Sequence, residues 1–226
     1  MKVDLIESWG SDLSVVNAAR VSFDKESEWE KEVVDVVGGF ETVKKLSDKD
    51  KKLINFLARE QHTSCFEHMG ATLRLKVPIF IARQIQRHRT FSYNEVSRRY
   101  IDDEPEFFWP DTWRMRADNV KQGSSDVEVS FDAKGWAKAV AEVALETYER
   151  LLEEGVAPEQ ARMILPQNMY TSFYMSGNLR AWSHFLSLRL DEHAQKEVRD
   201  VAEQVRDILA PLWPVSMEAL LENATG

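Results

Sequence analysis

One stretch of this sequence constrains the fold more than any other, because its alternation admits only a half-buried β-strand. In GATLRLKV (residues 70–77), Leu73, Leu75 and Val77 fall on one face and polar side chains fall on the other. A period of two over this length predicts a strand with one face against a core. MKVDLI (residues 1–6) alternates more briefly and predicts a second, shorter strand.

Most of the remaining chain has the 3.6-residue period of α-helices. Helices are predicted over DLSVVNAAR from Asp12, after a capping-box pattern at Ser47–Asp50, and over IFIARQIQRHR, with Pro78 as first helical residue. A longer helix is predicted along the apolar positions Trp136, Val140, Val143, Thr147 and Leu151 to Gly155, and a short one from Pro158 to about Leu165. Two more are predicted over Leu179–Leu188 and along Val198, Val201, Val205, Ile208 and Leu212, the last ended by Pro211 and Pro214. NMYTSFYM (168–175) fits a strand or a buried helix. Residues 25–45 are charged and mixed and predict no particular element, and residues 101–131 predict a long surface excursion.

Together these elements predict an α+β fold in a single domain spanning residues 1–226. A small, mainly antiparallel sheet is covered by helices, and the C-terminal half is helical. A chain of this size buries roughly 70% of its unfolded surface, which is enough for a substantial core.

The bulk composition narrows the class of function. The formal net charge of -9 argues against binding to a nucleic acid polymer, which needs a broad basic surface. No apolar run approaches the ~18 residues of a membrane span, and the N-terminus has no secretory pattern. A single cysteine, Cys65, excludes an internal disulfide and favours a reducing compartment, so we expect a cytoplasmic protein without membrane attachment.

Against this acidic background, RHRTFSYNEVSRRY (87–100) concentrates four arginines with Ser92, Asn94 and Ser97. Arginine side chains form paired hydrogen bonds to phosphate oxygens and keep their charge at any relevant pH. Serine hydroxyls and main-chain amides after a helix complete such an anion site. The alternative is a solvated basic face, which is the usual meaning of a charge run. The mixture of serine, asparagine and aromatic residues here favours an anion site.

Other catalytic patterns are missing from the sequence: it has no GxGxxG after a strand, no GxxxxGK[ST], no HExxH and no CxxC. His62, Glu67 and His68 could suggest a metal site, but their spacing and the lack of a further Cys or His partner argue against one. Cys65 is next to Phe66, and burial explains it better than a nucleophilic role.

The basic segment fits the pattern RHRxxSxNExSxR at every fixed position, from Arg87 to Arg99. This chain thereby resembles the flavin-dependent thymidylate synthases. The resemblance extends through AARVSFD (18–24), QHTSCFEH (61–68), VPIFIARQ (77–84), ARMILPQNMYTSFY (161–174) and NLRAWSHFLSLRLDEHAQ (178–195), in the order of that family.

The resemblance implies a reaction: methylation of dUMP to dTMP, with 5,10-methylenetetrahydrofolate as carbon donor and NADPH-reduced FAD as hydride donor. It also implies a homotetramer with active sites at subunit interfaces, and Arg189 as the catalytic residue that activates the uracil ring. The implied dUMP contacts are Gln84, Arg87, Glu95, Ser97, Arg98, Arg99, Arg162 and Arg189. The implied FAD contacts are Ser22, Ser64, Arg87, His88, Arg89, Glu95, Asn178, Arg180 and His184, with His62 and Glu67 near the flavin and folate.

Position 98 varies within the motif, so Arg98 could act through its main chain, and His184 stands where Asn or His is usual. Another class of function fits the basic segment as well: a non-catalytic protein that binds a nucleotide or single-stranded RNA through arginine and aromatic stacking. The acidic net charge and the absence of a basic groove outside 83–99 argue against that class.

Overall fold

A four-stranded antiparallel sheet forms the centre of the computed structural model, which describes residues 1–37, 39–99, 104–118 and 124–224. Its strands lie in the order β1 (Lys2–Trp9), β4 (Gly70–Pro78), β8 (Tyr170–Asn178) and β5 (Ser92–Glu95). The strands predicted at 1–6 and 70–77 are confirmed. The segment NMYTSFYM, for which a strand and a buried helix were both open, forms most of β8.

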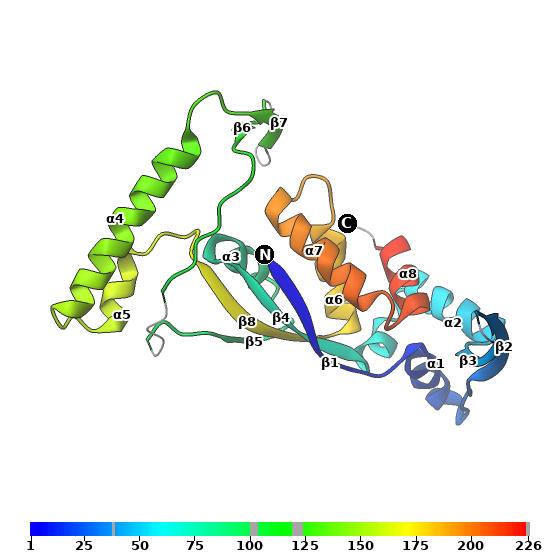
Figure 1. Ribbon diagram of the computed structural model, residues 1–226. Helices are drawn as coiled ribbons and strands as arrows, with labels where there is room; N and C mark the ends of the chain where they lie inside the picture. The colour runs from blue at the N-terminus through cyan, green and yellow to red at the C-terminus, as the bar shows by residue number, and fades with distance from the viewer. Residues whose placement is uncertain (38, 100–103, 119–123, 225–226) are drawn as a thin grey trace.

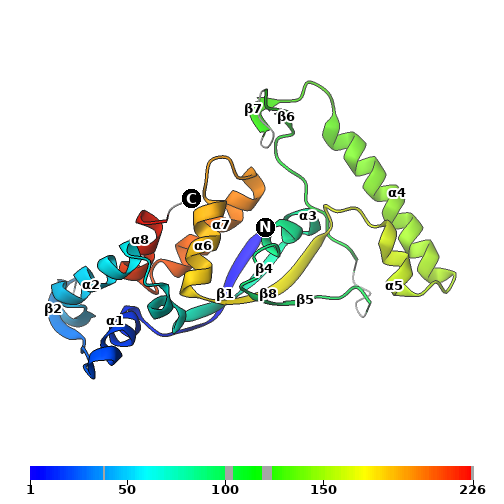
Figure 2. The same ribbon diagram turned by 180° about the vertical axis from the view of Figure 1, so that it is seen from behind.

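The alternation along β4 becomes two different faces of the sheet. Leu73, Leu75 and Val77 are completely buried, together with the neighbouring side chains of β8. Helices α3 (Ile79–Ile85), α6 (Leu179–Arg189) and α7 (Lys196–Leu209) lie on this side (Figures 1 and 2). Arg74 and Tyr174 are exposed on the opposite, polar side. The pattern that predicted the strand therefore also decides which side of the sheet receives helices.

The remaining helices complete an α+β fold, as the sequence predicted. They are α1 (Asp12–Arg20), α2 (Asp48–Arg59), α4 (Ala133–Glu153), α5 (Pro158–Ala161) and α8 (Pro214–Glu222), with 3-10 turns η1 (Val21–Phe23), η2 (Thr63–Glu67) and η3 (Arg162–Ile164). The cap at Ser47 is confirmed, since its Oγ accepts from the main-chain N–H of Asp50 at 3.1 Å.

The helix after β4 is shorter than its pattern predicts. Helix α3 ends at Ile85 instead of continuing to Arg89, and Pro78 is its N-cap rather than its first helical residue. The half-buried Tyr93 explains the early end: its hydroxyl donates to the carbonyls of Ile85 (3.2 Å) and His88 (2.8 Å). These bonds satisfy carbonyls at the helix end, and the chain turns back to pair as β5 along β8.

Two hairpins occupy segments whose sequence predicted no strands. In the 25–45 segment, β2 (Glu30–Val36) pairs with β3 (Gly39–Lys45). Within 101–131, β6 (Arg114–Arg116) pairs with β7 (Ser124–Glu128), so the excursion has local structure; its residues 101–103 and 119–123 lie outside the described part. Neither hairpin has the clean alternation of a half-buried strand, because both are largely exposed.

The C-terminal region contains two helices where one was predicted. Helix α7 ends at Leu209, so Leu212 lies beyond it. Pro214 then occupies the first turn of α8, where a missing N–H costs nothing. Proline thus starts a new helix here in addition to ending the previous one.

Helix α4 has the predicted apolar stripe, but the first half of this stripe is left largely uncovered by the described residues. Trp136, Val140 and Val143 remain 69%, 66% and 62% exposed. The helix stands away from the sheet with α5 beside its end (Figure 1). It ends near the predicted Gly155, whose φ of 85° suits a glycine after a helix.

Candidate active site

The site is built around the turn that ends α3, where the basic segment begins. His88 is buried in this turn, with its ring against Phe185 of α6 (centroids 5.1 Å apart) and near His184 (6.0 Å). Tyr93 stabilises the turn through its two hydrogen bonds to main-chain carbonyls. Burial raises the pKa of its hydroxyl to about 12. The hydroxyl therefore stays a donor, and the turn has a fixed geometry.

His88 in turn orients Arg189, the last residue of α6. Nε of Arg189 donates to Nε2 of His88 at 3.0 Å, and Nη2 donates to the carbonyl of Gln84 at 3.4 Å. A ring nitrogen that accepts carries no proton, so His88 is neutral with its proton on Nδ1. Burial first, and then the charges of Arg189 and His184, lower the pKa of His88 to about 4. The guanidinium of Arg189 is thus held on two sides by neutral acceptors.

Arg189 faces a cavity of about 790 Å³, which we call the Arg189 cavity. Three of the residues expected at the nucleotide line it: Gln84, Arg87 and Arg189. Other lining residues come from β6, β7 and the start of α7, among them Arg114, Ser124, Gln195 and Arg199. Burial, and then the nearby charge of Arg87, lower the pKa of Arg189, but an arginine remains charged at neutral pH. The cavity therefore offers fixed positive charge to an anionic ligand.

A second cavity of about 990 Å³ lies on the polar side of the sheet, and we call it the Arg162 cavity. Glu95, Arg98 and Arg162, all expected at the nucleotide, line it together with Lys76 and Arg83. Arg162 is exposed at η3, directly after α5. Within one chain the structure therefore divides the expected nucleotide residues between two cavities.

The last two expected nucleotide residues, Ser97 and Arg99, line neither cavity. They follow β5, and Nε of Arg99 donates to Oγ of Ser97 at 3.2 Å. This contact gives the serine hydroxyl a defined direction at the end of the basic segment.

Four of the nine residues expected at FAD lie in η2, at the end of β8 or in α6, and Arg87, His88 and Glu95 belong to the basic segment described above. Asn178 is the N-cap of α6, where its Oδ1 accepts from the N–H of Ala181 at 2.9 Å. Arg180 forms an ion pair with Glu67 of η2 at 2.6 Å. Ser64 is exposed in η2, and the ring of His62 stacks on Phe56 (centroids 6.0 Å apart). His184 belongs to the same side of α6, whereas Ser22 in η1 and Arg89 after α3 are exposed at other positions.

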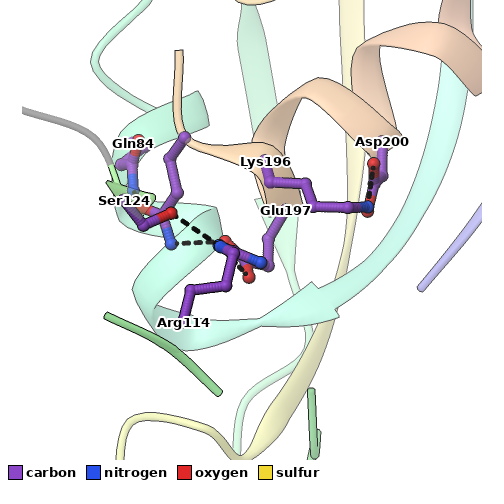
Figure 3. Close-up of polar contacts among 7 residues, drawn as sticks. Gln84, Arg114, Ser124, Lys196, Glu197 and Asp200 are labelled. Carbon is purple, nitrogen blue, oxygen red and sulfur yellow. Dashed lines mark hydrogen bonds and ion pairs between the residues drawn. The ribbon is translucent and has the colours of Figure 1, made fainter. Parts of the chain in front are cut away.

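Three residues beside the Arg189 cavity were not anticipated from the sequence. Glu197 in the first turn of α7 is buried, and it accepts from Arg114 at 2.7 Å (Figure 3). It also accepts from Gln195 at 2.8 Å. Burial alone would raise the pKa of its carboxyl, but these hydrogen bonds outweigh burial and lower it. In the sequence Glu197 resembles any polar residue of an amphipathic helix, so nothing local distinguishes it.

The described residues contain no group of three or more His, Cys, Asp and Glu side chains arranged to hold a metal ion. Cys65 is half-buried in η2, and burial raises the pKa of its thiol. A raised pKa makes the nucleophilic thiolate scarcer. Among the helices that the structure describes, none is long and apolar enough to cross a membrane.

Comparison with known proteins gives this geometry a family. The family described as "Thymidylate synthase complementing protein" matches residues 4–215. The flavin-dependent thymidylate synthase of Thermus thermophilus is 40% identical over 226 residues, covering 98% of this chain and 77% of that protein. The chain belongs to the flavin-dependent thymidylate synthase family. It is therefore an enzyme of the methyltransferase class, and the non-catalytic binding protein considered above is set aside.

Other members of the flavin-dependent thymidylate synthase family agree in extent and fold. The enzyme of Thermotoga neapolitana is 37% identical, covering 98% of this chain and 91% of its own. Among solved structures, the UMP/dUMP methylase PolB from Streptomyces cacaoi, bound with 5-Br dUMP, superposes with a TM-score of 0.79 at 36% identity. The match covers 98% of this chain and 94% of PolB, so the whole α+β fold is shared.

Proposed function

We propose that this protein methylates C5 of dUMP to give dTMP, with 5,10-methylenetetrahydrofolate supplying the carbon and NADPH-reduced FAD supplying the hydride. Membership of the flavin-dependent thymidylate synthase family supports the reaction. The likeness to PolB, a dUMP methylase bound to a dUMP analogue, supports the substrate. The single cysteine suits the reducing cytoplasm, where we place the enzyme.

Arg189 carries the proposal, because its environment directs a cation into a cavity. His88 accepts a hydrogen bond from Nε of Arg189, and the Gln84 carbonyl accepts one from Nη2, so the remaining guanidinium N–H groups are available to a ligand. Making C5 of uracil nucleophilic pushes negative charge onto N3 and O4. Directed donors beside that edge stabilise the charge as it develops. Arg189 would therefore activate the pyrimidine without a covalent bond from the enzyme.

The donor set between β8 and η2 fits a flavin dinucleotide. Arg180 offers cationic donors at the start of α6, and Asn178 keeps its Nδ2 free of the cap bond that its Oδ1 makes. Ser22, Ser64, Arg87, His88, Arg89, Glu95 and His184 complete the proposed contacts, with His62 and Glu67 at the flavin and folate. The bound FAD would supply the redox chemistry, while these residues hold and orient it.

No cysteine nucleophile is needed in this reading of the site. Burial raises the pKa of Cys65, and Cys65 is not among the residues that line the Arg189 cavity. The uracil ring would be activated by the charge of Arg189 instead.

The division of the nucleotide residues supports a site shared between chains. Gln84, Arg87 and Arg189 line one cavity, and Glu95, Arg98 and Arg162 line the other. A homotetramer would bring the Arg162 side of one chain to the Arg189 side of another. The exposed stripe on α4 offers apolar area for such an assembly, because its three large side chains are more than half exposed.

The spectrum of the purified protein tests the proposal. The sample should be yellow, and NADPH should bleach the flavin absorbance under anaerobic conditions. Adding dUMP together with methylenetetrahydrofolate should restore the absorbance and yield dTMP. Reoxidation at the same rate without dUMP, or flavin-loaded protein that forms no dTMP, would contradict the proposed reaction.

A further inference from the structure

A chain of hydrogen bonds connects Gln84 in the Arg189 cavity to the hairpin β6–β7 (Figure 3). Nε2 of Gln84 donates to Oε1 of Gln195. Nε2 of Gln195 donates to one oxygen of Glu197 at 2.8 Å, and Nη2 of Arg114 donates to the other at 2.7 Å. Nε of Arg114 also binds Oγ of Ser124 at 2.6 Å. Three elements distant in sequence thus meet at one buried carboxylate.

The polarity of this chain follows from its buried end. An ionised carboxylate only accepts, so Glu197 obliges Gln195 to turn its amide nitrogen inward. The side-chain oxygen of Gln195 then faces Gln84, so Gln84 must donate a hydrogen bond from its own Nε2. The lowered pKa of Glu197 agrees with an ionised group. Each glutamine amide, which could otherwise adopt either orientation, is therefore determined by its neighbour.

We propose that Gln195 and Glu197 are positioning residues that fix the side-chain amide of Gln84 with its carbonyl oxygen available to the nucleotide. The inference rests on the proposed function, in which Gln84 contacts dUMP. An amide oxygen accepts hydrogen bonds, so its partner on the ligand is an N–H or O–H group and not a phosphate oxygen. Gln84 would then read the pyrimidine ring or the sugar, and the neighbouring arginines would serve the negative charge.

Glu197→Gln should reverse the direction of the hydrogen bonds between positions 84, 195 and 197, with little change in side-chain shape. The new amide keeps an oxygen for Arg114 but presents a nitrogen to Gln195. Gln195 and then Gln84 are expected to turn over, so that Gln84 presents its nitrogen to the ligand. The double variant Gln84→Glu/Glu197→Gln accepts the reversed chain and still offers an acceptor oxygen at position 84.

The first experiment measures dUMP binding to the flavin-loaded protein by titration calorimetry. Glu197→Gln should weaken dUMP binding about tenfold, and the double variant should recover to within about threefold of wild type. Binding of inorganic phosphate should be unchanged by Glu197→Gln, which leaves the arginines of the cavity in place. Asp200→Asn is the matched control, because it changes another carboxylate of the same helix, one paired with Lys196 on the surface. Wild-type affinity in Glu197→Gln, or no recovery in the double variant, overturns the proposal.

A second measurement separates this inference from the proposed function. Gln84→Glu alone places a carboxylate against the oxygen of Gln195, so it should lower the unfolding midpoint, and adding Glu197→Gln should restore it. This rescue does not depend on any ligand. Rescue of stability without any effect of Gln84→Ala on dUMP binding would refute the nucleotide contact of Gln84 while leaving the hydrogen-bond chain intact. Absence of rescue refutes the chain itself.

Discussion

Helices α7 and α4 carry the same kind of apolar stripe, but among the residues that the structure describes only the stripe of α7 is covered. Val198, Val201 and Val205 of α7 are completely buried against the sheet and its helices, whereas Val140 and Val143 of α4 are more than 60% exposed. Periodicity thus identifies the face of a helix that requires cover, and it does not identify the cover. The α4 stripe has the apolar composition of a core-facing helix surface, but its side chains are exposed.

The two cavities follow the same division. The Arg189 cavity lies at the start of α7, and its arginine is tied to His88 and Gln84 within the chain. The Arg162 cavity lies beside α5, which follows α4, and opens on the polar side of the sheet. In the proposed shared site, the residues of the Arg189 cavity form one half, and the residues of the Arg162 cavity come from another chain.

Losing the directed donors on the α7 side should have the largest effect. Arg189→Lys keeps a charge but loses the guanidinium fork, and turnover to dTMP should fall roughly a hundred- to a thousandfold. The protein should remain yellow, and NADPH should still reduce it. Steady-state dTMP formation is the measurement, and near wild-type rates would remove Arg189 from the mechanism.

Mixing the Arg189→Lys variant with an Arg162→Gln variant tests whether the two cavities of one active site come from different chains. Arg162→Gln should also be nearly inactive, because it removes one of the proposed dUMP contacts. If sites combine Arg189 of one subunit with Arg162 of another, co-refolded mixtures should recover activity at about a quarter of the sites by random assembly. Two variants that stay inactive when mixed would show that both arginines act within one chain.

The pH dependence of stability measures how far His88, which orients Arg189 at its cavity, is shielded from water. Its pKa is about 4 in the folded protein, against about 6.5 when unfolded. The unfolded chain therefore binds the extra proton first, so stability is full above about pH 6.5 and falls as the pH drops toward 4. The loss attributable to His88 should reach about 3 kcal/mol.

Denaturant unfolding from pH 4 to 7.5, at one protein concentration, measures this loss. His88→Gln removes the titrating ring, and its stability should depend less steeply on pH by that amount. Equal slopes for the variant and the wild type would mean that His88 is solvated in the native protein.

Matched truncations compare the two stripes directly. Val201→Ala on α7 should lower the free energy of unfolding by about 2 kcal/mol, because two buried methyl groups are lost. Val140→Ala on α4 should change it little in a dilute sample. Val140→Lys should instead weaken self-association, measured by light scattering across a dilution series, and flavin retention should fall with it. A monomer that keeps its flavin would contradict the shared site.

Cys65→Ala should have the smallest effect. The thiol is half-buried and packs at the edge of the core, so the cost in stability should be about 1 kcal/mol. Thymidylate formation should remain close to wild type. Complete loss of turnover in a folded Cys65→Ala protein would contradict activation of uracil by charge alone.

Elements whose information is local could be predicted from the sequence. Residues 70–77 were recognised by their alternation, and α2 by the Ser47 cap. The end of α3 could not be predicted, because it depends on the hydroxyl of Tyr93 and on pairing with β8, far along the chain. The hairpins β2–β3 and β6–β7 escaped notice because exposed strands need no strict alternation.

The same distinction applies to the site. The basic segment and Arg189 were identified through a sequence pattern, and the structure brings Gln84, Arg87 and Arg189 together. Pattern alone gave no sign that Glu95 and Arg162 would line another cavity. Glu197 went unnoticed because its burial is created by Arg114 and Gln195, which come from other elements or turns.

The strand order of the central sheet also determines when this protein can fold during its synthesis. Thr72 of β4 and Ser176 of β8 share a hydrogen bond although 104 positions separate them. At about 5–20 residues per second a ribosome takes roughly 5–20 s to make that interval. Until then β4 has only β1 beside it, and two strands alone are marginally stable in water. The apolar face of β4 therefore lacks α6 and α7 until Leu209, the last residue of α7, has been made, which is more than nine-tenths of the way along the chain.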